Sequence, residues 1–119
     1  MIESHPLFSV SQLLRARRII GEAATIIRSS RWVQSPSPAI DHVRCESDAM
    51  CMYAALQRAS DSYDVSAEVL FYVRKSFDDL GFKGTIVQFN DEPGRTKDQV
   101  AEVLDTAISL LWDDIRGLQ

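Results

Sequence analysis

The chain has 119 residues, of which 45% are hydrophobic and 25% charged, with only 5 Gly and 4 Pro. This composition excludes collagen-like, low-complexity and wholly disordered chains, and the length predicts one domain, residues 1–119. No apolar run approaches the roughly 18 residues that a membrane span needs. The first residues lack the basic and apolar segments of a secretory signal, so we expect a cytoplasmic protein that does not act on membranes.

The formal net charge of −4 argues against direct nucleic-acid binding, because such surfaces are usually basic. Residues 1–45 carry six Arg against three acidic side chains, whereas residues 46–119 carry 7 basic and 14 acidic side chains. One interpretation is that helix faces of opposite sign attract one another. The other is an acidic surface that docks on a basic partner.

The first predicted helix begins after Ser9, which forms a capping-box pattern with Gln12, and ends at Ser29. Gly21 in its middle predicts a close approach by another helix. Two prolines then stop the helical pattern, so residues 33–45 are expected to form a surface loop. The apolar positions of this helix recur at helical spacing: Leu13, Ala16, Ile20, Ala23 and Ile27.

The second predicted helix runs from about Ser47 to about Ser60, and its long uncharged stretch predicts a central position. The third is capped by Ser66 and ends at Gly81. Residues 85–89 are β-branched and aromatic enough to form a short strand. Residues 31–34 are the plausible partner of that strand.

The fourth predicted helix follows a Pro93-Gly94 turn and begins with a capping box formed by Thr96 and Gln99. Its apolar stripe extends over residues 100–115. The sequence therefore predicts an all-α or mostly α fold. We expect a single-domain bundle of about four helices, which one short two-stranded β element could accompany.

Signatures of common catalytic and phosphate-binding sites are missing, so we expect no catalytic residues, cofactor or metal. His42, Cys45 and Cys51 could supply metal ligands, but their spacing matches no standard zinc pattern. Cys51 could also act as a nucleophile with His42 as its base. Because Cys51 is predicted one turn inside an apolar helix, a buried and inert thiol is the favoured interpretation.

The most informative polar block is residues 89–96, in which Asn90 and Asp91 are natural turn formers. One interpretation is a loop that caps and orients the last helix. The other is a pocket whose residues converge to hold a small polar or anionic ligand. Its candidate residues are Trp32, Gln34, Asn90, Asp91, Arg95 and Thr96.

The chain resembles a family of uncharacterised small domains found in bacteria and their phages. The family pattern places Gly-Trp-x-Gln after the first helix, Cys before an Ala-Leu-rich helix, and Trp-Asn-Asp and Arg-Thr before the last helix. The corresponding residues here are Trp32-Val-Gln34, Cys51, Ala54-Ala-Leu56, Asn90-Asp91 and Arg95-Thr96. Arg31 replaces the Gly and Phe89 replaces the second Trp. The resemblance implies a helical architecture but no reaction.

We therefore expect a small binding or inhibitory module, encoded by a phage or another mobile element. It would act on a partner protein or on a small polar or anionic ligand. One alternative is an enzyme that uses Asp91 as general acid or base, with Asn90 and Arg95 orienting the substrate. Another is a helical oligomerisation module, with Trp112 in the seam of a homodimer.

Overall fold

The computed structural model describes residues 8–29, 31–34, 49–62 and 64–118, and these ranges contain five helices and two short strands. The mostly helical fold confirms the predicted class, with one helix more than expected. The elements are α1 (Val10–Ser29), β1 (Arg31–Trp32), β2 (Ala49–Met50), α2 (Met52–Ser60), α3 (Ala67–Leu80), α4 (Ile86–Asp91) and α5 (Lys97–Leu118).

Several predicted features fall outside the described residues. They are most of the predicted surface loop 33–45, of which only Val33 and Gln34 are described, and the side chains of His42 and Cys45. Within the described residues, every helix is too short or too polar to cross a membrane.

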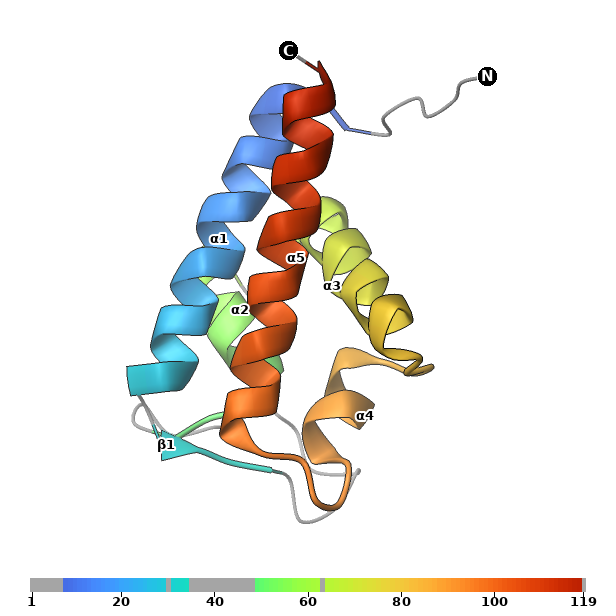
Figure 1. Ribbon diagram of the computed structural model, residues 1–119. Helices are drawn as coiled ribbons and strands as arrows, with labels where there is room; N and C mark the ends of the chain where they lie inside the picture. The colour runs from blue at the N-terminus through green and yellow to red at the C-terminus, as the bar shows by residue number, and fades with distance from the viewer. Residues whose placement is uncertain (1–7, 30, 35–48, 63, 119) are drawn as a thin grey trace.

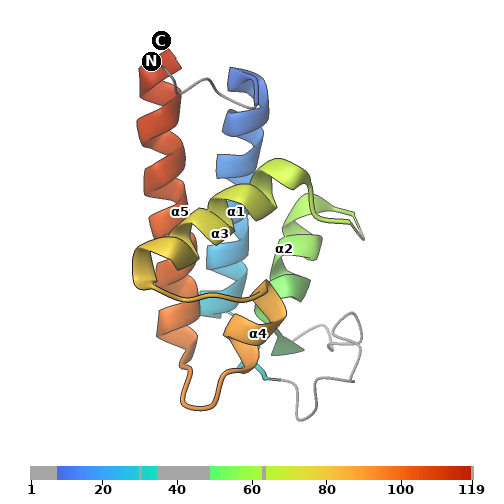
Figure 2. The ribbon, with the colours of Figure 1, turned by 90° about the vertical axis from the view of Figure 1, so that its right-hand side faces the viewer.

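The two longest helices, α1 and α5, lie antiparallel and form the centre of the molecule (Figure 1). α1 contacts α2, α3 and α5, whereas α2 covers one flank (Figure 2). The predicted central position of the second helix is therefore wrong. Part of the uncharged stretch that suggested it is not helical, and α2 buries one face only, through Met52, Ala55, Leu56 and Ala59.

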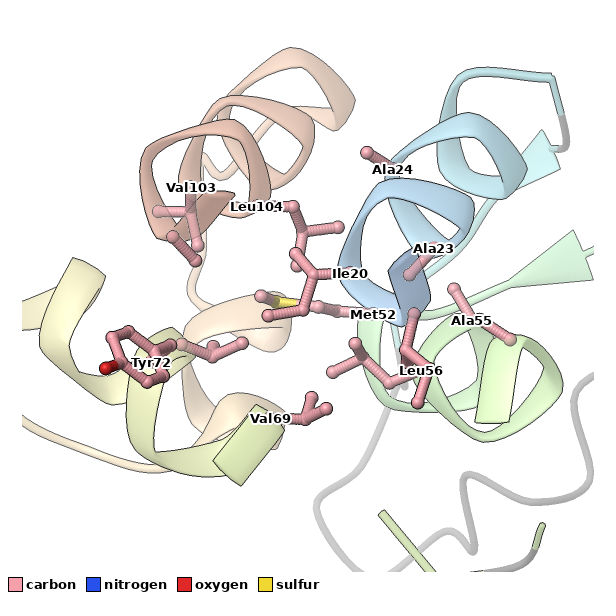
Figure 3. Close-up of a cluster of buried hydrophobic side chains, with 14 of the residues drawn as sticks. Ile20, Ala23, Ala24, Met52, Ala55, Leu56, Val69, Tyr72, Val103 and Leu104 are labelled. Atoms are coloured by element: carbon pink, nitrogen blue, oxygen red, sulfur yellow. The ribbon is translucent and has the colours of Figure 1, made fainter. Parts of the chain in front are cut away.

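The core forms where the apolar stripes of the helices meet. Ile20 of α1 and Leu104 of α5 face Met52 and Leu56 of α2, and Val69 of α3 closes the same cluster (Figure 3). The spacing of apolar residues at i+3 and i+4 places them on one side of each helix, where burial removes them from water. All five predicted apolar positions of α1 are buried, as are most of those predicted for α5.

The second helix begins later than predicted. Ala49–Met50 form β2, which pairs in parallel with β1, and the N–H of Val33 continues the ladder by donating to Met50 O at 3.1 Å. Cys51 is the N-cap of α2, with its Sγ accepting from Ala54 N at 3.3 Å. The prediction that Cys51 lies one turn inside the helix is wrong. Its predicted burial is confirmed, since it is 1% exposed.

Residues 85–89 do not form the predicted strand, because they belong to α4 and its N-cap. Thr85 and Gln88 form a capping box: Gln88 N donates to Thr85 Oγ1 at 3.1 Å, and Thr85 N donates to Gln88 Oε1 at 2.8 Å. The two reciprocal bonds satisfy backbone donors that a helix start leaves open. β1 consequently pairs with β2 instead of residues 85–89.

The other predicted boundaries are confirmed. Ser9 and Gln12 exchange both bonds of a capping box before α1. Ser66 is the N-cap of α3 without a side-chain bond, and α3 ends at Gly81, whose φ of 75° lies in the left-handed region. Glycine reaches that region at little cost, which explains its position after the helix.

The α1–α5 interface differs from one sequence prediction and agrees with another. A methyl group added at Gly21 would meet Ile108 Cδ1 at 3.8 Å, which is ordinary contact, so no close helix approach requires this glycine. Arg28 of α1 donates to both carboxylate oxygens of Asp105 of α5, as expected for helix faces of opposite charge. This hydrogen bond raises the pKa of Arg28 above its ordinary value. Trp112, the residue predicted to lie in the seam of a homodimer, is partly buried against the core.

Candidate functional site

Asn90, in the last turn of α4, is the centre of a buried hydrogen-bond cluster. Its Oδ1 accepts from Trp32 Nε1 at 2.7 Å and from Met52 N at 2.9 Å. Its Nδ2 donates to Val33 O at 3.1 Å and to Asp91 Oδ1 at 3.0 Å. A side-chain amide offers two acceptor and two donor positions, so protein groups use all four. We call Asn90, Trp32, Val33 and Met52 the Asn90 hub.

The hub joins segments that are distant in the chain. Trp32 is 58 positions from Asn90, and Met52 is 38 positions from it. Met52 N is one of the N–H groups that the start of α2 cannot bond within the helix, so Asn90 caps α2 from another element. Because Asn90 is only 1% exposed, the loss of its side chain would leave buried polar groups without partners.

Gln34 secures the end of α4 from the β1 side. Its Nε2 donates to Asn90 O at 3.0 Å and to Glu92 O at 2.8 Å. These carbonyls lie at the C-terminal end of the helix, where no later helical N–H reaches them. The amide donors of Gln34 therefore bond the backbone.

Thr96 has a comparable role at the start of α5. Its Oγ1 accepts from Gln99 N at 3.1 Å, and its backbone N–H donates to Gln99 Oε1 at 2.9 Å. The predicted capping box is confirmed, and it fixes the direction of the last helix.

Arg95 lies on the other side of α4. Its Nε donates to Phe89 O at 2.9 Å, and its guanidinium carbon lies 3.6 Å from the centroid of the Phe89 ring. The terminal nitrogen Nη2 lies 3.8 Å from Glu92 Oε1, which is longer than a hydrogen bond. The Arg95 side chain is only 16% exposed. A positive charge is therefore held in a fixed orientation near the surface.

A pocket of about 440 Å³ opens beside this guanidinium, between the end of α3, the connection to α4, and α5. Phe89 and Phe82 form part of its wall, and their rings meet edge to face with centroids 5.1 Å apart. Of the six predicted site residues, Arg95 lines it. Polar groups from α5 line it as well: Gln99, Glu102 and Thr106. We call this cavity the Arg95 pocket.

The structure thus brings Trp32, Gln34, Asn90 and Asp91 together, but it aims their described hydrogen bonds at protein groups. Thr96 caps α5, and Arg95 faces the pocket. A ligand-binding role for the six residues stays a prediction. The enzyme alternative also stays a prediction: it needs Asn90 to orient a substrate, and the described bonds of that side chain go to protein groups.

Sequence reasoning missed the residues that complete the Arg95 pocket. Gln99, Glu102 and Thr106 are spaced three and four positions apart, so they share one face of α5. Their spacing from Arg95 was the sequence signal that could have identified them as neighbours of Arg95. Phe82 had none, because only the fold brings the connection between α3 and α4 to the same cavity as α5.

These features define a small helical domain with a buried polar hub and an adjoining pocket. A family model described as a family of unknown function (DUF6197) matches residues 11–110, and the chain belongs to this family. No curated protein and no solved structure matches the chain.

Proposed function

We propose that this protein is a small binding module whose Arg95 pocket takes a small polar or anionic ligand. The observation that carries the proposal is the largely buried guanidinium of Arg95 at the wall of a pocket of about 440 Å³. Small-molecule sites commonly occupy roughly 300–1,000 Å³ and combine apolar walls with a few fixed polar groups. The Arg95 pocket has both features.

The neighbouring Asn90 hub supports this function by keeping the pocket in shape. It fixes α4, which carries Phe89, and Phe89 in turn holds Arg95 through its carbonyl and its ring. A site whose charged group is already oriented loses less entropy when a ligand binds. The hub therefore serves the pocket without touching the ligand.

A fragment screen by ligand-observed NMR tests the proposal. Thr106→Trp places an indole at the partly buried wall of the pocket, whereas Ser109→Trp places the same group on an exposed position of α5 outside it. We expect polar or anionic fragments to bind the wild type and the Ser109 variant, and to lose binding to the Thr106 variant. Circular dichroism checks that both variants fold.

Two results would contradict the proposal. One is a wild-type protein that binds no fragment at millimolar concentration. The other is fragment binding that Thr106→Trp leaves unchanged, because the ligand would then occupy another surface.

Binding to a partner protein is the second candidate, and an apolar groove favours it. The groove has a volume of about 580 Å³ and lies over α3, with Phe8, Phe71, Arg74 and Lys75 among its lining residues. Phe71 is 39% exposed, and its ring meets the Phe8 ring at a centroid distance of 5.7 Å. Exposed aromatic groups of this kind often mark interaction sites.

An inhibitory action on such a partner, by a module encoded by a phage or another mobile element, is the form of this candidate that the sequence resemblance favours. The simplest case of binding to a partner protein is a homodimer, in which the partner is a second copy of this chain. Sedimentation of the wild type and of Phe71→Ser tests that case, with a monomer in both samples as the contradicting result.

A further inference from the structure

We infer that the ligand of the Arg95 pocket is a carboxylate carried on an apolar body, as in a small aryl carboxylic acid or the free C-terminus of a peptide. The inference rests on the proposed function, because it names a chemical class of ligand for the same pocket.

The geometry of the guanidinium points to a carboxylate. Nε already donates to Phe89 O, and the ring of Phe89 covers one face of the group. Among the described residues, the terminal nitrogens make no hydrogen bond: Nη2 forms an ion pair with Glu92 Oε1 at 3.8 Å, and the Glu92 side chain is 50% exposed. Two N–H groups in one plane match the two oxygens of a carboxylate, which binds them in a bidentate pair.

The rest of the wall points to an apolar body next to that carboxylate. Phe82 and Val103 line the pocket together with Leu80, which is 60% exposed at the end of α3. An apolar group bound there would remove part of this surface from water. The cationic group and the apolar wall share one cavity, so a single ligand reaches both.

Glu102 sets the charge that the pocket accepts. Glu102 lines the same cavity as Arg95 and carries a negative charge, while Gln99 and Thr106 are neutral. Glu102 and Glu92, whose Oε1 lies 3.8 Å from Arg95 Nη2, offset the charge of Arg95 and leave little net attraction for a doubly charged anion. A monoanion is therefore favoured over inorganic phosphate or a phosphomonoester, and a donor group on the ligand would face Glu102 favourably.

Calorimetric titration with matched probes tests the class. The probes are phenylacetate against phenylacetamide, a tripeptide ending in phenylalanine with a free against an amidated C-terminus, and inorganic phosphate. We expect each acid to bind about 10-fold or more tighter than its amide, since hydrogen bonds to charged groups contribute about 1.5–3 kcal/mol. Tighter binding of phenylacetate would indicate a small acid as the ligand, and tighter binding of the free-acid tripeptide would indicate a peptide C-terminus. Inorganic phosphate should bind more weakly than either acid.

Variants at both charged positions complete the test. Arg95→Gln should remove most of the acid-over-amide preference, whereas Arg116→Gln, at the exposed far end of α5, should leave it unchanged. Glu102→Gln leaves the contacts of Arg95 intact and should tighten acid binding several-fold without changing amide binding. This second variant keeps the test valid if Arg95→Gln unfolds.

The outcomes separate the inference from the proposed function. Equal binding of acid and amide, tighter binding of phosphate, or no effect of Glu102→Gln would overturn the carboxylate class. The binding module would still stand if fragments of another class bound and were lost in Thr106→Trp. If the wild type bound neither these probes nor any fragment, both proposals would be wrong.

Discussion

Two polar residues close together in the sequence, Asn90 and Arg95, have different roles on the two sides of α4. On one side, all four hydrogen-bond positions of Asn90 meet protein groups, and the side chain is 1% exposed. On the other side, the guanidinium of Arg95 is held by Phe89 but borders an open pocket. The comparison shows that polar residues close together in sequence can belong to a closed structural cluster or to an open site.

The difference lies in which bonds the protein itself completes. A buried polar group is stable when its partners come from the fold. A charged group at a pocket that keeps donors available is suited to a ligand. The predictions below test this contrast, beginning with the largest expected effect.

Replacing the central residue of the hub should have the largest effect on stability. Asn90→Ala removes the partners of Trp32 Nε1, Met52 N and Val33 O, so we expect the free energy of unfolding to fall by about 3 kcal/mol. Chemical denaturation measures this change. Gln34→Ala, which removes bonds at a more exposed position, is the matched control and should cost about 1 kcal/mol. A loss below that of the control would show that the hub does not hold the fold.

The indole N–H should account for part of that loss. Trp32→Phe keeps an aromatic ring but removes the donor to Asn90 Oδ1, so we expect a loss of about 1–2 kcal/mol in the free energy of unfolding. In the Asn90→Ala background the same change should cost less, because its partner is already gone. Equal losses in both backgrounds would mean that the two side chains act independently.

The hydrogen bond between Tyr72 and Asp114 lies away from α4 and shows whether the hub contributes more to the free energy of unfolding than a single side-chain bond does. Tyr72 donates to Asp114 Oδ2 at 2.5 Å, and Tyr72→Phe should lower the free energy of unfolding by about 1 kcal/mol. Burial, and next the bond to Asp114, raise the pKa of Tyr72 above its ordinary value. The folded state thus keeps the proton longer than the unfolded state does. The contribution is therefore complete below the ordinary pKa of about 10 and decreases as the pH rises above it.

Denaturation at a series of pH values checks that sign. The wild type should lose stability more steeply than Tyr72→Phe above about pH 10. Parallel curves would contradict the assignment.

The smallest expected effect is a gain. Gly21→Ala places a methyl group at ordinary contact distance from Ile108 Cδ1 within α1, so thermal denaturation should show about 0.5–1 kcal/mol of added stability. Because Gly21 belongs to neither side of α4, fragment binding should stay unchanged. A destabilised variant would show that α1 and α5 approach more closely than the structure indicates.

Much of the fold could be predicted because its signals are local. The capping boxes at Ser9 and Thr96 and the apolar stripes of α1 and α5 depend on residues within a few positions of each other. α4 carried the same local signal in Thr85 and Gln88, but the β-branched and aromatic residues between and after them suggested a strand. The pairing of β1 with β2 could not be predicted, since it joins distant and very short segments.

The candidate site was predictable only in part, for a related reason. The sequence placed Trp32 beside Asn90, and the structure has them hydrogen-bonded. Whether those groups bond each other or face a ligand depends on the direction of each side chain, which residue types do not specify. Phe82, from the connection after α3, and Thr106 of α5 line the pocket because the fold brings these distant segments to one cavity.

Chemical-shift mapping of the wild-type protein with phenylacetate is the most direct test of the contrast between the two sides of α4. We predict the largest shifts at the backbone amides of Phe82, Arg95 and Thr106, with the Trp32 indole and the Asn90 side-chain amide unchanged. Shifts centred on that indole and that amide, with the pocket amides unchanged, would contradict the account, because the hub would then be the ligand site.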